Sequence, residues 1–160
     1  MERYFKKPAW LYLSVFITIS ALDIITKNLA EIFLSNRAID ILPFLKLTLV
    51  YNKGIAFGFL SDLPDAVRKP LLVSFSITGI IISFLYTIKI KRKVVALLMG
   101  IIGGGAFGNL YDRLFLGHVR DFIYLHYGPY HWPAFNIADA SITLSVLILI
   151  LHSLVYERRR

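Results

Sequence analysis

Residues 70–111 read PLLVSFSITGIIISFLYTIKIKRKVVALLMGIIGGGAFGNLY, and this segment decides the fold. It contains two stretches without a charged side chain, residues 70–88 and 94–111, on either side of a basic segment at residues 89–93. A helix needs about 20 apolar residues, with a range of about 17–25, to cross the hydrocarbon core of a bilayer. The segment therefore predicts a helical hairpin that crosses a membrane twice.

Two further uncharged stretches lie outside this hairpin, at residues 8–22 and 140–156. The first reaches spanning length only if its helix continues past Asp23 to Lys27. A cleaved signal peptide is the alternative for this stretch, but SALD at residues 20–23 is a poor cleavage site and three more spans follow. We therefore expect four membrane spans, at about residues 8–28, 70–88, 94–111 and 137–156.

The composition excludes an ordinary soluble domain and a disordered chain. Hydrophobic residues make up 57% of the chain and charged residues 18%, against soluble averages of roughly 45–50% and about 25%. Such a chain would expose large apolar patches unless lipid covered them, and its 12 Phe and 9 Tyr are too many for a solvated coil. The chain has no Cys, which excludes disulfides, thiolate zinc sites and cysteine nucleophiles.

Basic residues predict the orientation of the spans. Of the 18 Lys and Arg, 10 lie in three clusters, at residues 3–7, 89–93 and 158–160, and the net charge is +8. Four spans place these clusters on one side of the membrane, which the positive-inside rule assigns to the cytoplasm. Anionic cytoplasmic lipid accounts for the charge, so no nucleic-acid partner is expected. Both termini are then cytoplasmic.

The two outward-facing connections are residues 28–69 and 112–139. In the first, FLKLTLVY at residues 44–51 alternates between apolar and other side chains and predicts a strand. A turn at residues 52–54 and a return strand at residues 55–60 would complete a small extracytoplasmic sheet on the membrane surface. The second connection contains two glycines and two prolines, which predict irregular backbone.

Ionisable residues within a membrane span are costly, so each one needs an explanation. Asp23 and Lys27 stand four residues apart near the outer end of the first span, on one helix face. An ion pair and a direct role in chemistry are both open for these two residues. In the third span, Gly100, Gly104 and Gly108 repeat every four residues, a pattern that allows helices to approach closely.

Polar side chains from separate segments are expected at the same outer boundary. Close packing along the glycine stripe would place the end of the third span at this boundary. The segment FNIAD at residues 135–139 lies at the start of the fourth span. The acid of HVRDF at residues 118–122 lies between them in the sequence. The convergent set comprises Asp23, Asn109, Asp112, Asp121, Asn136 and Asp139.

Two carboxylates in one site share a proton, because both cannot ionise cheaply side by side. The ionised acid can activate water while the protonated partner polarises a carbonyl, as in aspartic proteases. The sequence has no G-x-S-x-G nucleophile elbow, and its G-x-G-x-x-G at residues 103–108 lies inside a span with no preceding strand. The spacings of His118, His126 and His131 fit no helical ligand pair, so we expect no metal and no cofactor.

Five motifs in order resemble those of the bacterial lipoprotein signal peptidases (signal peptidase II), and the resemblance covers essentially the whole chain. The family patterns D-x-x-(S/T)-K, N-x-G-x-A-F, G-N-x-x-D-R, V-x-D-F and F-N-x-A-D match residues 23–27, 52–57, 108–113, 119–122 and 135–139. Each motif is short, but five of them in this order are specific. The resemblance implies a single membrane peptidase domain over residues 1–160, an all-α bundle of four transmembrane helices with a small extracytoplasmic β-sheet, or cradle, and an outer loop that could include residues 61–67.

The resemblance also implies an activity and its site residues. The family contains aspartic endopeptidases of the bacterial inner membrane that cut diacylglyceryl-modified prolipoproteins just before the lipidated cysteine, so substrate and membrane lipid are the expected partners of a monomer. Asp121 and Asp139 match the catalytic dyad, near the outer face of the membrane. The residues expected to bind substrate or support the dyad are Asn52, Gly54, Asn109, Arg113, Asn136, Asp23, Lys27 and Asp112.

A small proton-coupled carrier, or a non-catalytic membrane scaffold with buried acids, is the alternative function. Carriers usually show repeat symmetry and binding sites at the bilayer midplane. In this chain the acids gather at one boundary and the spans show no repeat, which favours the peptidase. Cleavage of a lipidated lipobox peptide by detergent-purified protein would separate the two functions.

We expect both termini and the loop at residues 89–93 to face the cytoplasm. Single cysteines can be introduced into this cysteine-free chain and labelled from either side of the membrane. A cysteine near Asp62 should react only with reagent added to the outer side. Labelling of that position from the cytoplasmic side alone would contradict the predicted topology.

Overall fold

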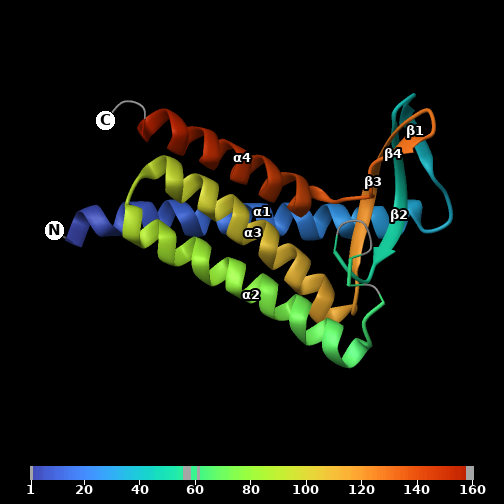
Figure 1. Cartoon of the computed structure of the whole chain (residues 1–160), viewed down its shortest axis with the longest axis horizontal. Helices are drawn as coiled ribbons and strands as arrows, with labels where there is room; N and C mark the ends of the chain where they lie inside the picture. The colour runs from blue at the N-terminus through green and yellow to red at the C-terminus, as the bar shows by residue number, and fades with distance from the viewer. Residues whose placement is uncertain (1, 56–58, 61, 158–160) are drawn as a thin grey trace.

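The computed structural model describes residues 2–55, 59–60 and 62–157 and gives four long helices with one small sheet (Figure 1). The helices are α1 (Glu2–Leu34), α2 (Asp65–Ile90), α3 (Lys93–Phe115) and α4 (Ile137–Glu157). The strands are β1 (Ile39–Leu42), β2 (Leu45–Asn52), β3 (Val119–Tyr127) and β4 (Tyr130–His131), which form an antiparallel sheet in the order β1-β2-β3-β4.

All four helices are long and apolar enough to cross a membrane, over Pro8–Leu34, Asp65–Ile90, Lys93–Phe115 and Ile137–Leu154. The predicted number of four spans is therefore confirmed, and α1, α2 and α3 each extend further outward than expected. The turn between α2 and α3 lies at the same end as both chain termini, and the sheet caps the opposite end (Figure 1). This arrangement agrees with the predicted clustering of basic residues on one side.

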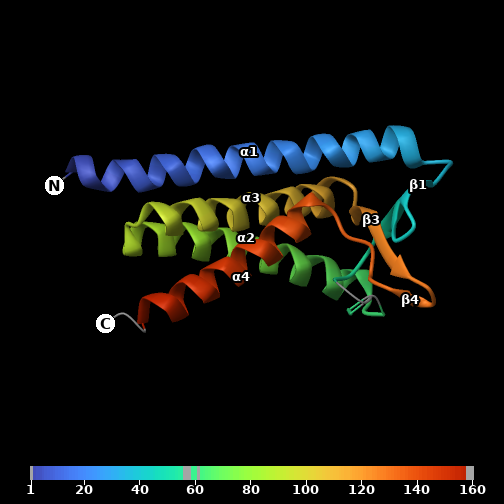
Figure 2. The same ribbon diagram turned by 90° about the horizontal axis from the view of Figure 1, so that it is seen from above.

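Helix α3 is the centre of the bundle and packs against α1, α2 and α4 (Figure 2). In its most apolar window 61% of the residues are buried, against 11–22% in the other three helices. The predicted glycine stripe explains the close approach to α1, since a Cβ on Gly100 would lie 2.8 Å from the carbonyl oxygen of Tyr12, and one on Gly104 would lie 2.6 Å from that of Phe16.

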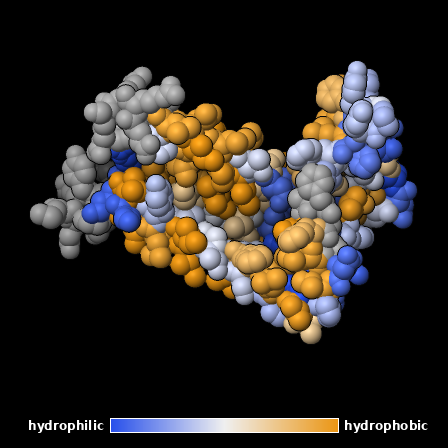
Figure 3. Space-filling view, viewed as in Figure 1, coloured by the Kyte–Doolittle hydropathy of each residue, from blue (hydrophilic) through white to orange (hydrophobic). Residues whose placement is uncertain are grey.

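The outer surface of the helices is apolar, as a lipid-facing surface must be. Figure 3 shows hydrophobic residues spread over the helical part, with hydrophilic residues gathered toward its ends and on the sheet. On α4, for example, Leu147, Ile148 and Leu151 are each at least half exposed. Large apolar side chains exposed in this number are stable against lipid but not against water.

The sheet confirms one predicted strand and corrects two other expectations. Strand β2 matches the predicted strand, but it pairs with β3 and not with residues 55–60. Of those residues, 56–58 lie outside the described part, while Ile55, Phe59 and Leu60 belong to no strand, and the amide of Ile55 donates to the carbonyl of Phe59 at 3.1 Å. The expected hairpin between β2 and a return strand after Gly54 is therefore wrong.

The connection at residues 112–139 was expected to be irregular, and this is wrong for residues 112–115, which continue α3, and for Val119–Tyr127, which form β3. Its two glycines lie just outside the strand, where Gly117 and Gly128 have φ of 77° and 55°. They mark the ends of an apolar and aromatic strand, because only glycine adopts this backbone region at little cost. The expected outer loop is also shorter than predicted, since α2 begins at Asp65 and residue 61 lies outside the described part.

We expect Gly104→Leu to harm folding and assembly more than the chemistry of the folded fraction. The side chain would meet the backbone of α1 at Phe16 and force the two helices apart, and overpacking of this kind costs about 1–3 kcal/mol or more. Thermal unfolding in detergent measures the loss of stability.

A matched pair of alanine variants isolates the steric effect. A Cβ on Gly79 of α2 would meet only the Cβ of Ala106, at 3.9 Å, so Gly79→Ala should be tolerated while Gly104→Ala is destabilising. Equal melting temperatures for the two alanine variants would contradict a tight α1–α3 contact.

Candidate active site

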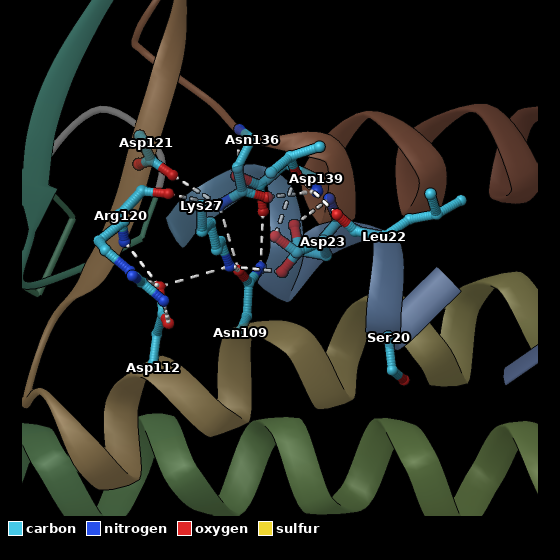
Figure 4. Close-up of polar contacts among 12 residues, drawn as sticks. Ser20, Leu22, Asp23, Lys27, Asn109, Asp112, Arg120, Asp121, Asn136 and Asp139 are labelled. Atoms are coloured by element: carbon cyan, nitrogen blue, oxygen red, sulfur yellow. Dashed lines mark hydrogen bonds and ion pairs between the residues drawn. The ribbon is translucent and has the colours of Figure 1, made fainter. Parts of the chain in front are cut away.

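The polar residues lie together where the outer parts of α1 and α3 meet β3 and the start of α4 (Figure 4). The whole set predicted to converge from separate segments is found here, joined by one residue that was not predicted, Arg120. The cluster contains Asp23 and Lys27 of α1, Asn109 and Asp112 of α3, Arg120 and Asp121 of β3, and Asn136 and Asp139 at the start of α4.

Lys27 stands at the centre of this cluster and is fully buried. Its ammonium nitrogen lies 2.7 Å from Oδ2 of Asp23 and 3.5 Å from Oδ2 of Asp112, and it donates to Oδ1 of Asn109 at 2.7 Å. A buried ammonium is stable only with such partners. The ion pair expected between Asp23 and Lys27 is present, and a direct role of either residue in chemistry stays a prediction.

The start of α4 is fixed by side chains from two elements. Oδ1 of Asp23 accepts the amide of Ala138 at 2.8 Å, so a carboxylate of α1 caps α4. Oδ1 of Asn136 accepts the amide of Asp139 at 3.0 Å, and Oδ2 of Asp139 accepts the amide of Asn136 at 3.3 Å, a reciprocal capping pair. The carboxyl group of Asp139 is thereby held at the outer end of the bundle.

Asparagine side chains connect the two predicted catalytic acids. Asn136 donates from Nδ2 to Oδ1 of Asp121 at 2.6 Å and to Oδ1 of Asn109 at 3.1 Å. Asn109 in turn donates to Oδ1 of Asp139 at 2.8 Å, and Asn52 of β2 donates to Oδ2 of Asp121 at 2.9 Å. Each carboxylate therefore receives amide donors that set its orientation without adding charge.

Burial controls the protonation of Asp121. It raises the pKa of this carboxyl from 3.8 to about 7, and the negative charge of Asp139 acts in the same direction. The hydrogen bonds from Asn52 and Asn136 oppose the shift, because they stabilise the ionised form. A carboxyl with a pKa near neutrality can accept and return a proton in the physiological range.

The other predicted site residues lie at the edge of the cluster. Arg113 donates from Nη1 to the hydroxyl of Ser76 on α2 at 2.9 Å. Gly54 donates its backbone amide to Oδ1 of Asn52 at 2.9 Å, so it holds the asparagine that contacts Asp121. His118 lies against the ring of Tyr51. Among the described residues, no group of three or more His, Cys, Asp or Glu is arranged to hold a metal ion.

Sequence reasoning missed Arg120 and its partner Asn28. Arg120 is buried, and its guanidinium pairs with Asp112 and with the side-chain oxygen of Asn28. The only sequence signal was a basic residue placed between Val119 and Asp121 in an apolar stretch. A buried arginine in such a strand requires a carboxylate partner, but the sequence does not say which one.

A cavity of about 510 Å³ lies beside the cluster, and Figure 3 shows the cleft between the sheet and the helices with hydrophilic residues inside it. Asn52, Asn109, Arg113 and Asp139 line its polar part. The rest of the lining is largely apolar and includes Leu125 and Trp132–Phe135 of the sheet side and Ile142–Leu144 of α4. The cavity therefore joins a lipid-facing helix surface to one of the two acids.

Comparison with known proteins shows the family of this chain. The family model described as Signal peptidase (SPase) II matches residues 15–155. The chain belongs to the signal peptidase II family. The lipoprotein signal peptidase of Aquifex aeolicus (strain VF5) is 57% identical over 151 residues, which cover 94% of this chain and 90% of that relative. The lipoprotein signal peptidase of Sulfurihydrogenibium sp. (strain YO3AOP1) is 44% identical over 96% of this chain and 97% of that protein.

The fold also matches a solved structure, a bacterial membrane enzyme determined by the in meso method at 2.3 Å resolution. The TM-score is 0.80 at 26% sequence identity, with 93% of this chain and 90% of the other chain covered. Membership of the signal peptidase II family makes this protein a membrane peptidase, and it confirms the resemblance seen in the five motifs.

The raised pKa of Asp121 predicts how the stability of this signal peptidase II family member depends on pH. Below about pH 3 the carboxyl is protonated in both the folded and the unfolded chain. As the pH rises from 3.8 toward 7, the unfolded chain loses the proton first, so the wild type loses stability that Asp121→Asn keeps. The melting temperature of Asp121→Asn minus that of the wild type should therefore increase from about pH 4 to about pH 8. A difference that stays constant over this range would contradict the burial of an acid with a raised pKa.

Proposed function

We propose that this membrane peptidase is an aspartic endopeptidase that removes the signal peptide from diacylglyceryl-modified prolipoproteins by cutting just before the lipidated cysteine. Asp121 and Asp139 form its catalytic dyad, and no metal or cofactor takes part. One observation carries the proposal: two acids from separate elements are joined through Asn109 and Asn136 beside a cavity that reaches the lipid-facing surface of α4.

The chemistry follows from one shared proton. The ionised acid of the dyad removes a proton from water, whose oxygen attacks the carbonyl carbon of the scissile peptide bond. The protonated acid donates to the carbonyl oxygen, so that the tetrahedral intermediate is neutral. When the C–N bond breaks, the proton taken from water passes to the leaving amine, while the other acid takes back the hydroxyl proton of the intermediate as the new carboxyl group forms. The pair thereby returns to its singly protonated state.

The environment of the dyad suits this proton sharing. Asp121 is 1% exposed, and the amide donors from Asn52, Asn109 and Asn136 orient the carboxylates without neutralising them. A cationic donor in those places would favour two ionised acids and remove the general acid. The asparagines are therefore supporting residues of the reaction.

The cavity suits a substrate whose scissile bond lies at the membrane boundary. Acyl chains on the modified cysteine remain in the bilayer, since each buried CH₂ contributes about 0.8 kcal/mol. The adjacent peptide bond is then held near the level where α4 begins, beside Asp139. Arg113 and Asn52 line the polar part of the cavity and could bind the peptide backbone of the substrate.

We also propose the location in which this reaction occurs. The enzyme lies in the bacterial inner membrane with both termini in the cytoplasm and the dyad near the outer face, because the sheet and the basic loop lie at opposite ends of the bundle (Figure 1). All residues of the site come from one chain, so a monomer is sufficient for activity.

We expect Asp121→Asn and Asp139→Asn each to lower kcat by about 10²–10⁴-fold or more, because each removes a general acid–base group with little change in shape. The double variant should lose little beyond the single variants, since the dyad acts as a unit. A diacylglyceryl lipobox peptide that carries a fluorophore and a quencher reports cleavage in detergent.

Asp40→Asn is the matched control, because its carboxylate lies on β1 of the same sheet, is 72% exposed and pairs only with Lys46 among the ion pairs of the described residues. It should cleave like the wild type. Substrate binding to the dyad variants should persist. Near-normal turnover by either correctly folded dyad variant would refute the assignment of Asp121 and Asp139.

A further inference from the structure

Arg120 links the strand that carries Asp121 to the ends of two helices, and neither the proposed chemistry nor the five motifs gives it a role. We infer that Arg120 is a positioning residue for the dyad: it fixes the backbone next to Asp121 and occupies Asp112, so that Lys27 remains bound to Asn109. This inference rests on the proposed function of Asp121 and Asp139.

All three guanidinium nitrogens of Arg120 donate hydrogen bonds to residues of α1 or α3. Its Nη2 donates to Oδ1 of Asp112 at 2.8 Å, and its Nε donates to Oδ2 of Asp112 at 3.3 Å. Its Nη1 donates to Oδ1 of Asn28 at 2.8 Å. The side chain is only 5% exposed. The planar guanidinium thus holds β3 against α1 and α3 at once, a geometry that a lysine ammonium cannot reproduce.

The backbone of Arg120 is held as well. Its amide donates to Oδ2 of Asp112 at 2.9 Å, and its carbonyl accepts Nδ2 of Asn136 at 3.4 Å. Both peptide groups that flank this residue are therefore tied to the cluster, immediately before Asp121. Since Asn136 also contacts Asp121 directly, movement of the Arg120 backbone would displace the acid and its donor together.

Arg120 also affects the second acid through Lys27. The ammonium of Lys27 lies 3.5 Å from Asp112 but 2.7 Å from Oδ1 of Asn109, and this contact leaves the amide nitrogen of Asn109 to donate to Asp139. With Arg120 removed, Asp112 would be a buried carboxylate with one remaining cation in reach. Lys27 would then move toward Asp112, and Oδ1 of Asn109 would keep only the donor from Asn136, the longer of its two hydrogen bonds.

The charges of the cluster agree with the pairing of Arg120 with Asp112 and of Lys27 with Asp23 and Asn109. Together with Arg113 at its edge, the cluster has four carboxylates and three cations when all are ionised, so a single proton on the dyad makes this set neutral. Replacement of Arg120 by a neutral residue would require another proton or an unpaired buried charge. The charged groups that face one another are Asp23 and Lys27 of α1, Asp112 and Arg113 of α3, Arg120 and Asp121 of β3, and Asp139 of α4.

The test compares Asp112→Asn, Arg120→Gln, Arg120→Lys and the double variant Asp112→Asn/Arg120→Gln, with the fluorogenic lipidated peptide as substrate. For Arg120→Gln we expect kcat to fall at least about tenfold, as a displacement of about 1 Å can cost about 10²-fold, with KM within about twofold. Both limbs of its pH profile should move to higher pH, because loss of a nearby cation favours the protonated acids. Arg120→Lys keeps the charge, so it should keep the wild-type pH profile while kcat falls less.

The double variant distinguishes positioning from a purely structural role. Asp112→Asn removes the carboxylate that would attract Lys27, so the double variant should regain part of the kcat lost in Arg120→Gln. Independent structural damage would instead make the two losses multiply. Wild-type kcat and pH profile in Arg120→Gln, or multiplicative losses in the double variant, would overturn the inference. If Arg120→Gln does not fold, Arg120→Lys decides, because an ammonium cannot reproduce the contacts with both Asp112 and Asn28, and wild-type kcat in this variant would overturn the inference.

Two controls separate this inference from the proposed function. Lys46→Gln removes a cation from the exposed part of the same sheet and should leave kcat and the pH profile unchanged. Asp121→Asn and Asp139→Asn, assayed in parallel, test the dyad itself. If the dyad variants are inactive and Arg120→Gln is fully active, only the positioning role fails. If the dyad variants remain active, the proposed function fails, whatever Arg120→Gln does.

Discussion

The burial of one ammonium group organises this protein. Lys27 is fully enclosed within the helical bundle, where an unpaired charge would be costly. It must therefore bring carboxylate and amide oxygens of α1 and α3 to one point, and the partners that it collects are Asp23, Asn109 and Asp112. Because Asp23 also caps α4, the same group that neutralises Lys27 determines where the fourth helix begins. The contacts that neutralise Lys27 therefore both pack the helices together and assemble the site.

Neutral amides separate the charged part of the cluster from the proposed dyad. The ion pairs of Asp23 and Asp112 lie on one side, and Asn109 and Asn136 transmit their fixed geometry to Asp121 and Asp139 on the other. Direct contact between a cation and the dyad would stabilise two ionised acids, whereas amide donors orient a carboxyl and leave it able to hold a proton. Burial, and then the charge of Asp139, therefore raise the pKa of Asp121 to about 7 although Lys27 is near.

The small sheet brings distant parts of the chain to the end of the bundle. Strand β2 carries Asn52 and pairs with β3, which carries Asp121, so one register places donor and acceptor together. Arg120 then ties β3 to the helices through Asp112 and Asn28. The sheet also forms one wall of the cavity whose other wall is α4, which joins the polar cluster to a surface that faces lipid.

The sequence alone determined the features that depend on local pattern: four apolar spans, the clustering of basic residues, the glycine stripe, a strand at about residues 44–51 and the motif acids. Each of these follows from periodicity or charge within a short window. Tertiary structure decided the pairing of β2 with β3, the contact of Arg120 with Asp112, and which asparagine serves which acid. These contacts join residues far apart in the chain, such as Asn52 with Asp121 and Lys27 with Asn109, and a strand or a buried charge has several possible partners until the helices pack. The close approach of α1 to α3 along the glycines decides which of these possible partners come into contact, and these contacts place the acids together.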